Sequence, residues 1–399
     1  MSKLWSMEEE NLEAAGVEME TSPEEGEAAN VQIDTDEGVG EVGDITEAVD
    51  SGLEASSELE EVQAVVEQAA GEGEGLDPIA AEAIRIAVSA IASKIGANPK
   101  AVYSLYAVEN FQSASSRRAN TQIALEGVQE FLKDLWKKIK DALNKLWAKA
   151  KAFWAKHVSN VGQVKKALDS MKAKVKASSG KFSGKPYLDK APGSLVSAFP
   201  GKGDLNAKAV EGFIAGIEGL VKRAGVVADV LAGSAGKDLA AWKTKIDSAV
   251  GSEDSFVVVG GDKLTIKYDA DQEEGAVKLE LEREPVEDKE EERGMTVGDK
   301  ATLISLLDQA LASIKTTIEL QKKADKSAQA ASTFMNDIEK EIAAANQSPE
   351  DAKATRTKMR LGYKLSAFDA KISSIAAAEN VKLCRAVLGF AAVSLKQYK

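Results

Sequence analysis

A Gly- and Lys-rich stretch at residues 180–186 is the closest approach in this chain to a nucleotide-binding loop. It reads Gly180-Lys181-Phe182-Ser183-Gly184-Lys185-Pro186. A phosphate-binding loop has four residues between its glycines, where this chain has three. It also has a Ser or Thr after the Lys that follows the second Gly, where this chain has Pro186, and a β-strand before the loop. All three requirements fail here. We therefore interpret residues 178–202, which are rich in Gly, Ser and Pro, as a loop or linker.

Four acidic residues approach the spacing of a calcium-binding loop: Asp269, Asp271, Glu273 and Glu280. Such a loop needs Gly at the sharp turn, where this chain has Glu274, and it lies between helices. The flanking segments here have the alternating pattern of strands. We therefore predict a solvated hairpin loop without a metal ion.

The chain has one His and one Cys. One Cys excludes a disulfide framework and a zinc cluster built from cysteines, and one His argues against a His-rich metal site or a Ser/His triad. His157 and Cys384 lie in predicted helices, where a packing or surface role is expected. No pair of carboxylates stands out for acid–base catalysis. The sequence therefore predicts a protein that is not an enzyme and has no metal, cofactor or small-molecule substrate.

A long basic amphipathic helix is predicted over residues 126–157, where apolar and aromatic residues recur three and four positions apart with lysines between them. Lysines continue along a second predicted helix. The lysines of both are Lys133, Lys137, Lys138, Lys140, Lys145, Lys149, Lys151, Lys156, Lys165, Lys166, Lys172, Lys174 and Lys176. Residues 131–190 hold 16 basic and 4 acidic residues, a net charge of +12.

Three uses of this basic helix stay open at the level of sequence. Its apolar face can pack against other helices of the chain while its lysines remain in water. The lysines can neutralise DNA phosphates without reading the base sequence, which is compatible with that packing. Alternatively, Trp136, Trp147 and Trp154 can insert at a membrane surface.

Charge is divided very unevenly along the chain. The 399 residues carry 51 Lys and Arg against 64 Asp and Glu, a net charge of −13. Residues 1–109 hold 26 acidic and 4 basic residues, a net charge of −22, whereas residues 110–399 have a net charge of +9. An acidic head on a basic body bears on the choice of partners. No apolar stretch is long enough to span a membrane, and no secretory signal is predicted.

The remaining patterns are mainly helical. Acidic residues 1–76 are predicted to be disordered, with a transiently helical amphipathic patch over residues 59–70. Short helices are predicted over 77–94, with Asp77 as N-cap, and over 100–108. Residues 206–250 return to a helical pattern, residues 256–282 predict three short antiparallel strands, and residues 298–395 predict two long helices joined near Pro349.

The fold class is thus mainly α: a helical bundle and long helical hairpin with a small antiparallel β-unit and a disordered acidic N-terminal segment. We predict four regions: an acidic, largely disordered propeptide with short helices (1–109), a basic amphipathic helical region (110–190), a linker with helices and a β-hairpin unit (191–295), and a long antiparallel helical hairpin (296–399).

Tripeptides of a small residue, any residue and Glu recur along the chain, as expected by chance in a sequence rich in Ala and Glu. Ala107-Val108-Glu109 stands where the charge reverses and is followed by a polar segment. Ala124-Leu125-Glu126 opens the long basic helix.

The order of these features resembles the internal head, or prohead core, proteins of large tailed bacteriophages. The resemblance covers residues 77–180 and is carried by Val108-Glu109-Asn110-Phe111, by Ser115-Ser116-Arg117-Arg118-Ala119-Asn120-Thr121-Gln122-Ile123-Ala124-Leu125-Glu126-Gly127, and by the Lys/Trp helix. In that family a maturation protease removes an acidic propeptide after a small-x-Glu site, and the basic part stays in the capsid with the DNA. The resemblance implies one cut after Glu109, at the site formed by Ala107, Val108 and Glu109. Ala124, Leu125 and Glu126 form a second candidate site, with the cut after Glu126.

The resulting hypothesis is a non-enzymatic protein inside the capsid of the virion, made in the host cytoplasm during assembly. Its expected partners are phage DNA bound non-specifically, the prohead protease acting on it as substrate, capsid or other core proteins, and further copies of itself. Two alternatives from other classes stay open: a membrane-active protein co-ejected with the genome, and an assembly scaffold whose long C-terminal helices drive oligomerisation.

Overall fold

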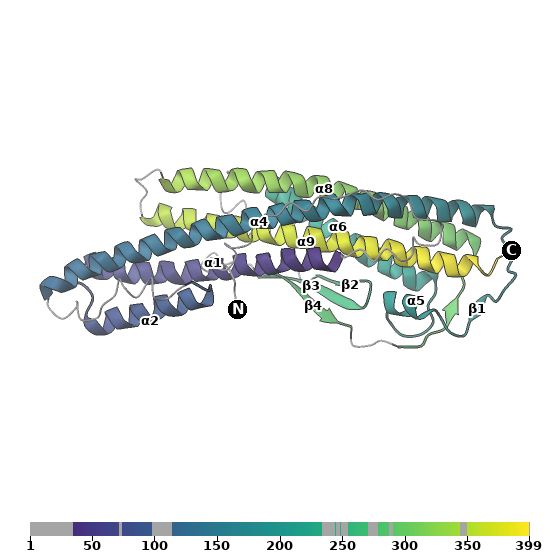
Figure 1. The fold of residues 1–399 in the computed structure, drawn as a ribbon, viewed down its shortest axis with the longest axis horizontal. Coiled ribbons are helices and arrows are strands. Elements are labelled where there is room, and N and C mark those ends of the chain that lie inside the picture. Colours follow the sequence, from purple (N-terminus) through teal and green to yellow (C-terminus); the bar gives the residue numbers. More distant parts are fainter. Residues whose placement is uncertain are drawn as a thin grey trace, which may run out of the picture. The chain divides into compact units, whose positions relative to one another are not determined.

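The computed structural model describes residues 35–71, 74–97, 114–233, 244, 248, 254–269, 278–286, 290–343 and 349–398. These residues belong to two compact units. The first unit holds residues 43–146, and the second holds residues 35–42 and 147–398. Helices make up most of the described chain (Figure 1), which confirms the predicted mainly α fold with a small antiparallel sheet.

The first unit contains three helical segments: α1 (Thr35–Gly71) from residue 43 on, α2 (Pro78–Lys94), and α4 (Ala114–Ala177) up to residue 146. The start of α2 is confirmed, because the Asp77 carboxylate accepts hydrogen bonds of 2.8 Å from the backbone N–H groups of Ile79 and Ala80. At the end of α2, Lys94 pairs with Glu58 of α1 at 2.5 Å.

Helix α1 corrects the prediction of disorder for residues 35–71, where only a transient helix over residues 59–70 is predicted. Eight of its buried positions repeat in heptad order and form the α1 seam: Val42, Ile45, Val49, Gly52, Ser56, Leu59, Gln63 and Val66. A stripe that repeats every 3.5 residues is typical of helices packed like a coiled coil. Eleven acidic residues on α1 outnumber the apolar seam residues, so the average composition hid the pattern. Residues 1–34 and the helix predicted over 100–108 lie outside the described residues.

Helix α4 is longer than predicted. The sequence suggested a helix over residues 126–157 followed by a second helix, whereas α4 is continuous over 64 residues. Its apolar seam does not stop after residue 157, because Val161, Val164, Leu168 and Val175 are buried in the second unit. Continued burial of one helical face explains why no break occurs.

The second unit is built around a helical hairpin of α8 (Lys300–Ala343) and α9 (Pro349–Leu395), which confirms the predicted C-terminal hairpin (Figure 1). Helix α6 (Ala207–Gly233) packs on both, and α5 (Gly193–Ala198) and the sheet also contact α9. Residues of α9 are therefore buried on nearly every side between residues 361 and 391. Of the predicted helical stretch 206–250, residues 234–243 lie outside the described residues.

The predicted β-unit is present as a three-stranded antiparallel sheet in the order β2 (Asp254–Val257), β3 (Asp262–Asp269) and β4 (Lys278–Pro285). Gly260 and Gly261 turn the chain between β2 and β3 with positive φ angles of 93° and 84°. On β4, Arg283 lies 3.6 Å from Glu379, a buried residue of α9, so an ion pair attaches the sheet to the hairpin.

Residues 178–202 are more ordered than the predicted linker. They contain α5 and the short strand β1 (Tyr187–Leu188), which pairs with β5 (Met295–Thr296). Buried Leu195 and Phe199 fix the segment, and the buried Arg293 guanidinium donates hydrogen bonds to the carbonyls of Phe199 and Gly203. Gly, Ser and Pro content alone concealed these few anchoring residues.

Asp369 is a fully buried acid between α8 and α9. The hydroxyl of Ser327 hydrogen-bonds to one of its oxygens, and the hydroxyl of Ser373 donates to the other at 3.2 Å. Loss of hydration on burial raises the pKa of Asp369 to about 7, the two hydroxyls oppose that rise, and Asp229 adds to it. The neutral form of Asp369 fits this site. Its carboxyl O–H can donate a hydrogen bond to the Ser327 hydroxyl, which itself donates to the Ala324 carbonyl at 3.1 Å.

We expect Asp369→Asn to remove a pH dependence of stability. Between about pH 4 and about pH 7, the Asp369 carboxyl is ionised in the unfolded chain and neutral in the folded chain. The free energy of unfolding of the wild type therefore falls as pH rises through this range. The Asn variant should match the wild type near about pH 4 and exceed it by on the order of 4 kcal/mol at about pH 8. Urea unfolding at both pH values measures the difference. Asp325→Asn, at an exposed position of α8, is the control and should show no such divergence.

Candidate functional site

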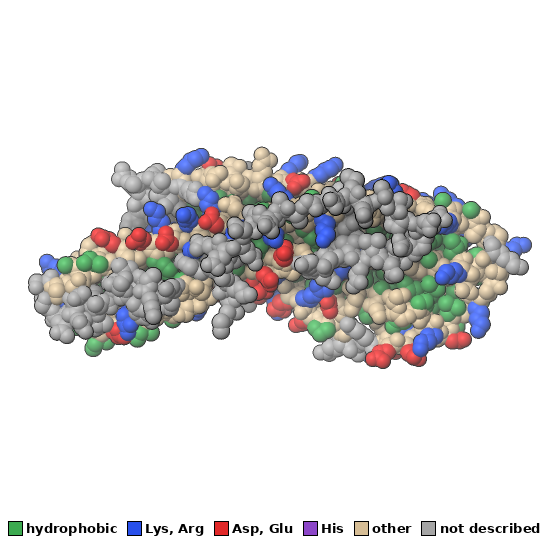
Figure 2. Space-filling model, viewed as in Figure 1, with side chains coloured by type: hydrophobic (Ala, Val, Ile, Leu, Met, Phe, Trp, Pro, Cys, Tyr) green, Lys and Arg blue, Asp and Glu red, His purple; other side chains and the backbone are tan. Residues whose placement is uncertain are grey.

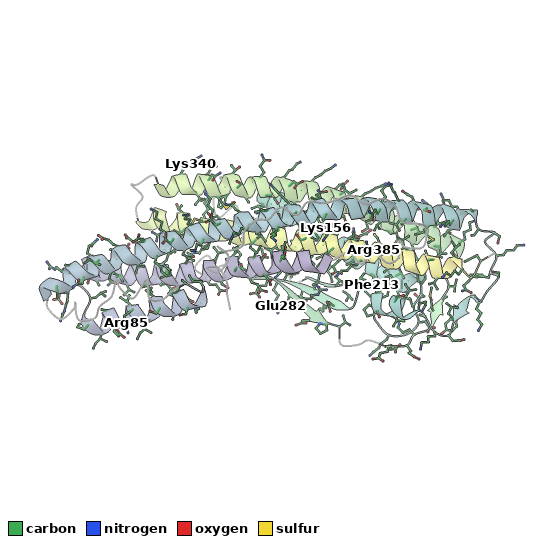
Figure 3. All side chains as sticks on the ribbon, viewed as in Figure 1. Arg85, Lys156, Phe213, Glu282, Lys340 and Arg385 are labelled. Carbon is green, nitrogen blue, oxygen red and sulfur yellow. The ribbon has the colours of Figure 1, made fainter. Side chains whose placement is uncertain are left out.

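The structure places all thirteen predicted lysines on the single helix α4, and we call them the α4 lysines. Five are partly buried, namely Lys138, Lys140, Lys145, Lys165 and Lys172. The exposed ones are Lys133, Lys137, Lys149, Lys151, Lys156, Lys166, Lys174 and Lys176. Lys156 is labelled on α4 in Figure 3. A row of cations along one exposed helix can contact an extended polyanion, but it forms no pocket for a small ligand.

Acidic side chains of the same chain neutralise part of this row. Lys149 lies 3.1 Å from Glu41 of α1, Lys165 pairs with Asp169 at 2.8 Å, and Lys172 pairs with Asp308 of α8. Exposed ion pairs of this kind are each worth about 0–1 kcal/mol and weaken in salt. On the face drawn in Figure 2, Lys and Arg side chains lie scattered among Asp and Glu. These cations can therefore exchange their carboxylate partners for another anion at low cost.

The aromatic face of α4 is part of the core. Trp147 and Trp154 are 7% and 4% exposed, and Trp136 is partly buried. The indole N–H of Trp147 donates a hydrogen bond of 2.8 Å to the buried hydroxyl of Ser366 on α9. For two of these three Trp residues to enter a membrane, α4 has to leave the second unit. Within the described residues, no helix is long and apolar enough to cross a membrane.

The two proposed cleavage tripeptides differ in what the structure shows. Ala107, Val108 and Glu109 lie outside the described residues. Ala124, Leu125 and Glu126 lie inside α4, with Ala124 and Leu125 buried and only Glu126 exposed. Proteases cut exposed, locally unfolded backbone, so cleavage after Glu126 requires α4 to open.

The described residues show no arrangement typical of a catalytic or metal site. They contain no group of three or more His, Cys, Asp or Glu side chains that could hold a metal ion. Cys384 is fully buried on α9, and burial raises the pKa of its thiol well above the usual range. The Gly180–Pro186 segment follows α4 directly rather than a strand, and the side chain of His157 is outside the described ones.

Sequence reasoning missed α1 as a neighbour of the α4 lysines. Glu41 reaches Lys149, and the C-terminal half of α1 approaches α4 where the Gln129 amide lies 3.5 Å from Glu67. The heptad spacing from Val42 to Val66 was the signal that could have revealed this helix.

We expect the folded protein to show no blue shift of Trp fluorescence with anionic vesicles, because Trp147 and Trp154 are already buried. Trp5 and Trp242 lie outside the described residues, so the measurement uses a Trp5→Phe/Trp242→Phe variant in which only the α4 indoles report. A blue shift with full retention of helical circular dichroism would contradict this expectation and favour the membrane-active alternative.

No curated protein and no solved structure matches the chain. One protein family does match it, the phiKZ-like phage internal head proteins, over residues 30–392. The match extends well beyond residues 77–180, on which the resemblance rested, and includes both structural units. The chain therefore belongs to the phiKZ-like phage internal head proteins.

Proposed function

We propose that this internal head protein is made as a precursor, is cut after Glu109 by the prohead protease, and then associates non-specifically with the packaged DNA through the α4 lysines. As a member of its family it is a structural protein inside the phage capsid. The observation that supports the finer statement is the reversal of charge near Glu109, from a net −22 before it to a net +9 after it.

Electrostatics gives this reversal a physical role. Before cleavage, the acidic residues compete with DNA phosphates for the same lysines, as the pair of Lys149 and Glu41 illustrates. After cleavage, cations on α4 can neutralise phosphates and release their counterions, without base contacts. Contacts with the capsid interior, with other core proteins and between copies belong to the same proposal.

The scaffold alternative receives less support from the fold. The long helices α8 and α9 pack on each other and on α6, so α9 uses its apolar surface within the chain. Oligomerisation through that surface requires the hairpin to open. A role of the exposed faces of these helices in self-association remains compatible with the proposal.

We expect the protein isolated from mature virions to begin at Asn110. Intact mass and N-terminal sequencing of purified particles measure this directly. A chain of full-length mass, in which Met1 and Asn110 are still joined, contradicts the processing step, and an N-terminus at Gly127 moves the cut to the second candidate site.

Neutralising lysines on α4 is expected to weaken DNA binding and reduce its salt dependence. The test uses the full chain cut after Glu109, which is the state in which the proposal expects DNA binding, with Lys133, Lys137 and Lys151 replaced by Gln. Each lysine that contacts a phosphate contributes about one unit to the slope of log K against log salt, so the slope should fall by up to about three.

The matched control replaces three exposed lysines of α6 and α8 by Gln, namely Lys208, Lys222 and Lys326. It removes the same charge from the chain but leaves α4 intact. Gel shifts over a range of salt concentrations distinguish the variants. An equal loss of affinity in both triple variants indicates a response to net charge alone and overturns the assignment to α4.

A further inference from the structure

Helices α1 and α4 form an antiparallel pair in both units. In the second unit, Glu41 pairs with Lys149. The Phe153 ring lies close to Gly38, because a Cβ atom on Gly38 would come within 3.1 Å of it. In the first unit, Glu67 lies 3.5 Å from Gln129. Residue numbers rise along α1 as they fall along α4, so one helix lies along the other in the opposite direction.

The connection between α1 and α2 also rests on α4. The backbone N–H of Leu76 donates a hydrogen bond of 2.8 Å to the hydroxyl of Thr121, and both residues are buried. Gly75 has a φ of +72°, and a Cβ there would come within 2.7 Å of the backbone carbonyl carbon of Arg117. The start of α4 therefore holds the backbone of the acidic segment against it.

Each of the two helices buries an apolar stripe, and the two carry opposite net charge. The α1 seam includes Val42, Val49, Leu59 and Val66, each 0% exposed. On α4, Val128, Leu132, Leu135 and Ile139 are buried in the first unit at similar spacing. Helix α1 carries eleven acidic residues and no Lys or Arg, whereas α4 carries fifteen Lys and Arg and five Asp and Glu. Apolar burial does not weaken in salt, and the flanking charges select an acidic partner.

A break in the chain between α2 and α4 removes none of these contacts. The contacts that hold α1 and the connection after it to α4 involve residues 38–76 on one side of the break and residues 117–153 on the other. Glu109 falls between them.

We propose that α4 is a docking surface for an acidic amphipathic helix, and that its occupant is the segment carrying α1 and α2, which stays bound non-covalently after the chain is cut. The inference rests on the proposed function for the cut at Glu109 and deepens it by naming the partner that packs on α4 and pairs with Lys149 through Glu41. A single cut then leaves the acidic segment in place, and its removal is a separate, later step.

The test uses the full chain with a site-specific protease sequence in place of residues 102–108. After complete cutting, the two fragments should elute together in size-exclusion chromatography at about 0.1 M and at about 1 M NaCl, where the Debye length falls from about 10 Å to about 3 Å. Separate elution of the N-terminal fragment at the lower salt concentration overturns the proposal.

Matched variants locate the contact on α1. Leu59→Asn places a polar amide in the seam at a position that is 0% exposed, and it should release the fragment after cutting. Val65→Asn, six residues further along α1 at a position 55% exposed, should retain it. Equal retention or equal loss in the two cut variants contradicts a contact made through the seam.

Gly75→Ala provides an independent test outside the seam, because any Cβ at this position meets the α4 backbone. It should also release the fragment after cutting, and circular dichroism of the uncut variant shows whether the helices still form. Retention of the cut Gly75→Ala fragment as in the wild type contradicts the placement of this turn on α4. Because the cut is engineered, failure here leaves processing in virions untouched, and a chain of full-length mass in virions leaves this result untouched.

Discussion

The apolar stripe of α4 is the constraint on which the structure depends. A helix of 64 residues with aromatic and aliphatic side chains along one side needs other helices to cover that side in water. In this chain, segments that precede α4 and segments that follow it in the sequence pack on it. In the first unit the cover is α1 with α2, from the acidic N-terminal part, and in the second unit it includes α9 from the far C-terminus, as the contact between Trp147 and Ser366 shows. One helix thus connects the most acidic and the most buried parts of the chain.

The two kinds of cover have different chemistry. Helix α9 is buried on nearly every side and places several polar groups in its interior, including Asp369 and Asn380, whose side chain bonds with Ser313 and Thr317 of α8. Such satisfied polar contacts fix the register of α8 against α9, because a shifted pairing leaves buried groups without partners. Helix α1 instead carries an aliphatic seam with carboxylates beside it. Its association with α4 therefore depends on both hydrophobic burial and charge. The contacts of α9 and those of α1 therefore differ in kind: buried polar groups fix the first, and apolar burial flanked by charge makes the second.

Much of the fold was predictable because local signals and tertiary packing agree. Asp77 and Pro78 mark the start of α2, Pro349 marks the start of α9, and alternation across Gly260 marks the sheet. The errors came where an average hid a pattern. Carboxylates between Val42 and Val66 suggested disorder, and the Gly and Ser content near Leu195 suggested a linker. The α4 lysines were predictable from periodicity, but their partners Glu41 and Asp308 depend on contacts between distant segments, which spacing along the chain does not encode.

The length of α4 sets the scale of any contact it makes. At about 1.5 Å per residue, its 64 residues extend for about 96 Å along the helix axis. Stacked base pairs advance by about 3.4 Å each, so this distance equals about 28 base pairs, or nearly three turns of duplex. Under the proposed association with DNA, cations spaced along such a helix contact the phosphates of more than one groove. The proposed association therefore involves a length of packed genome and not a single site on it.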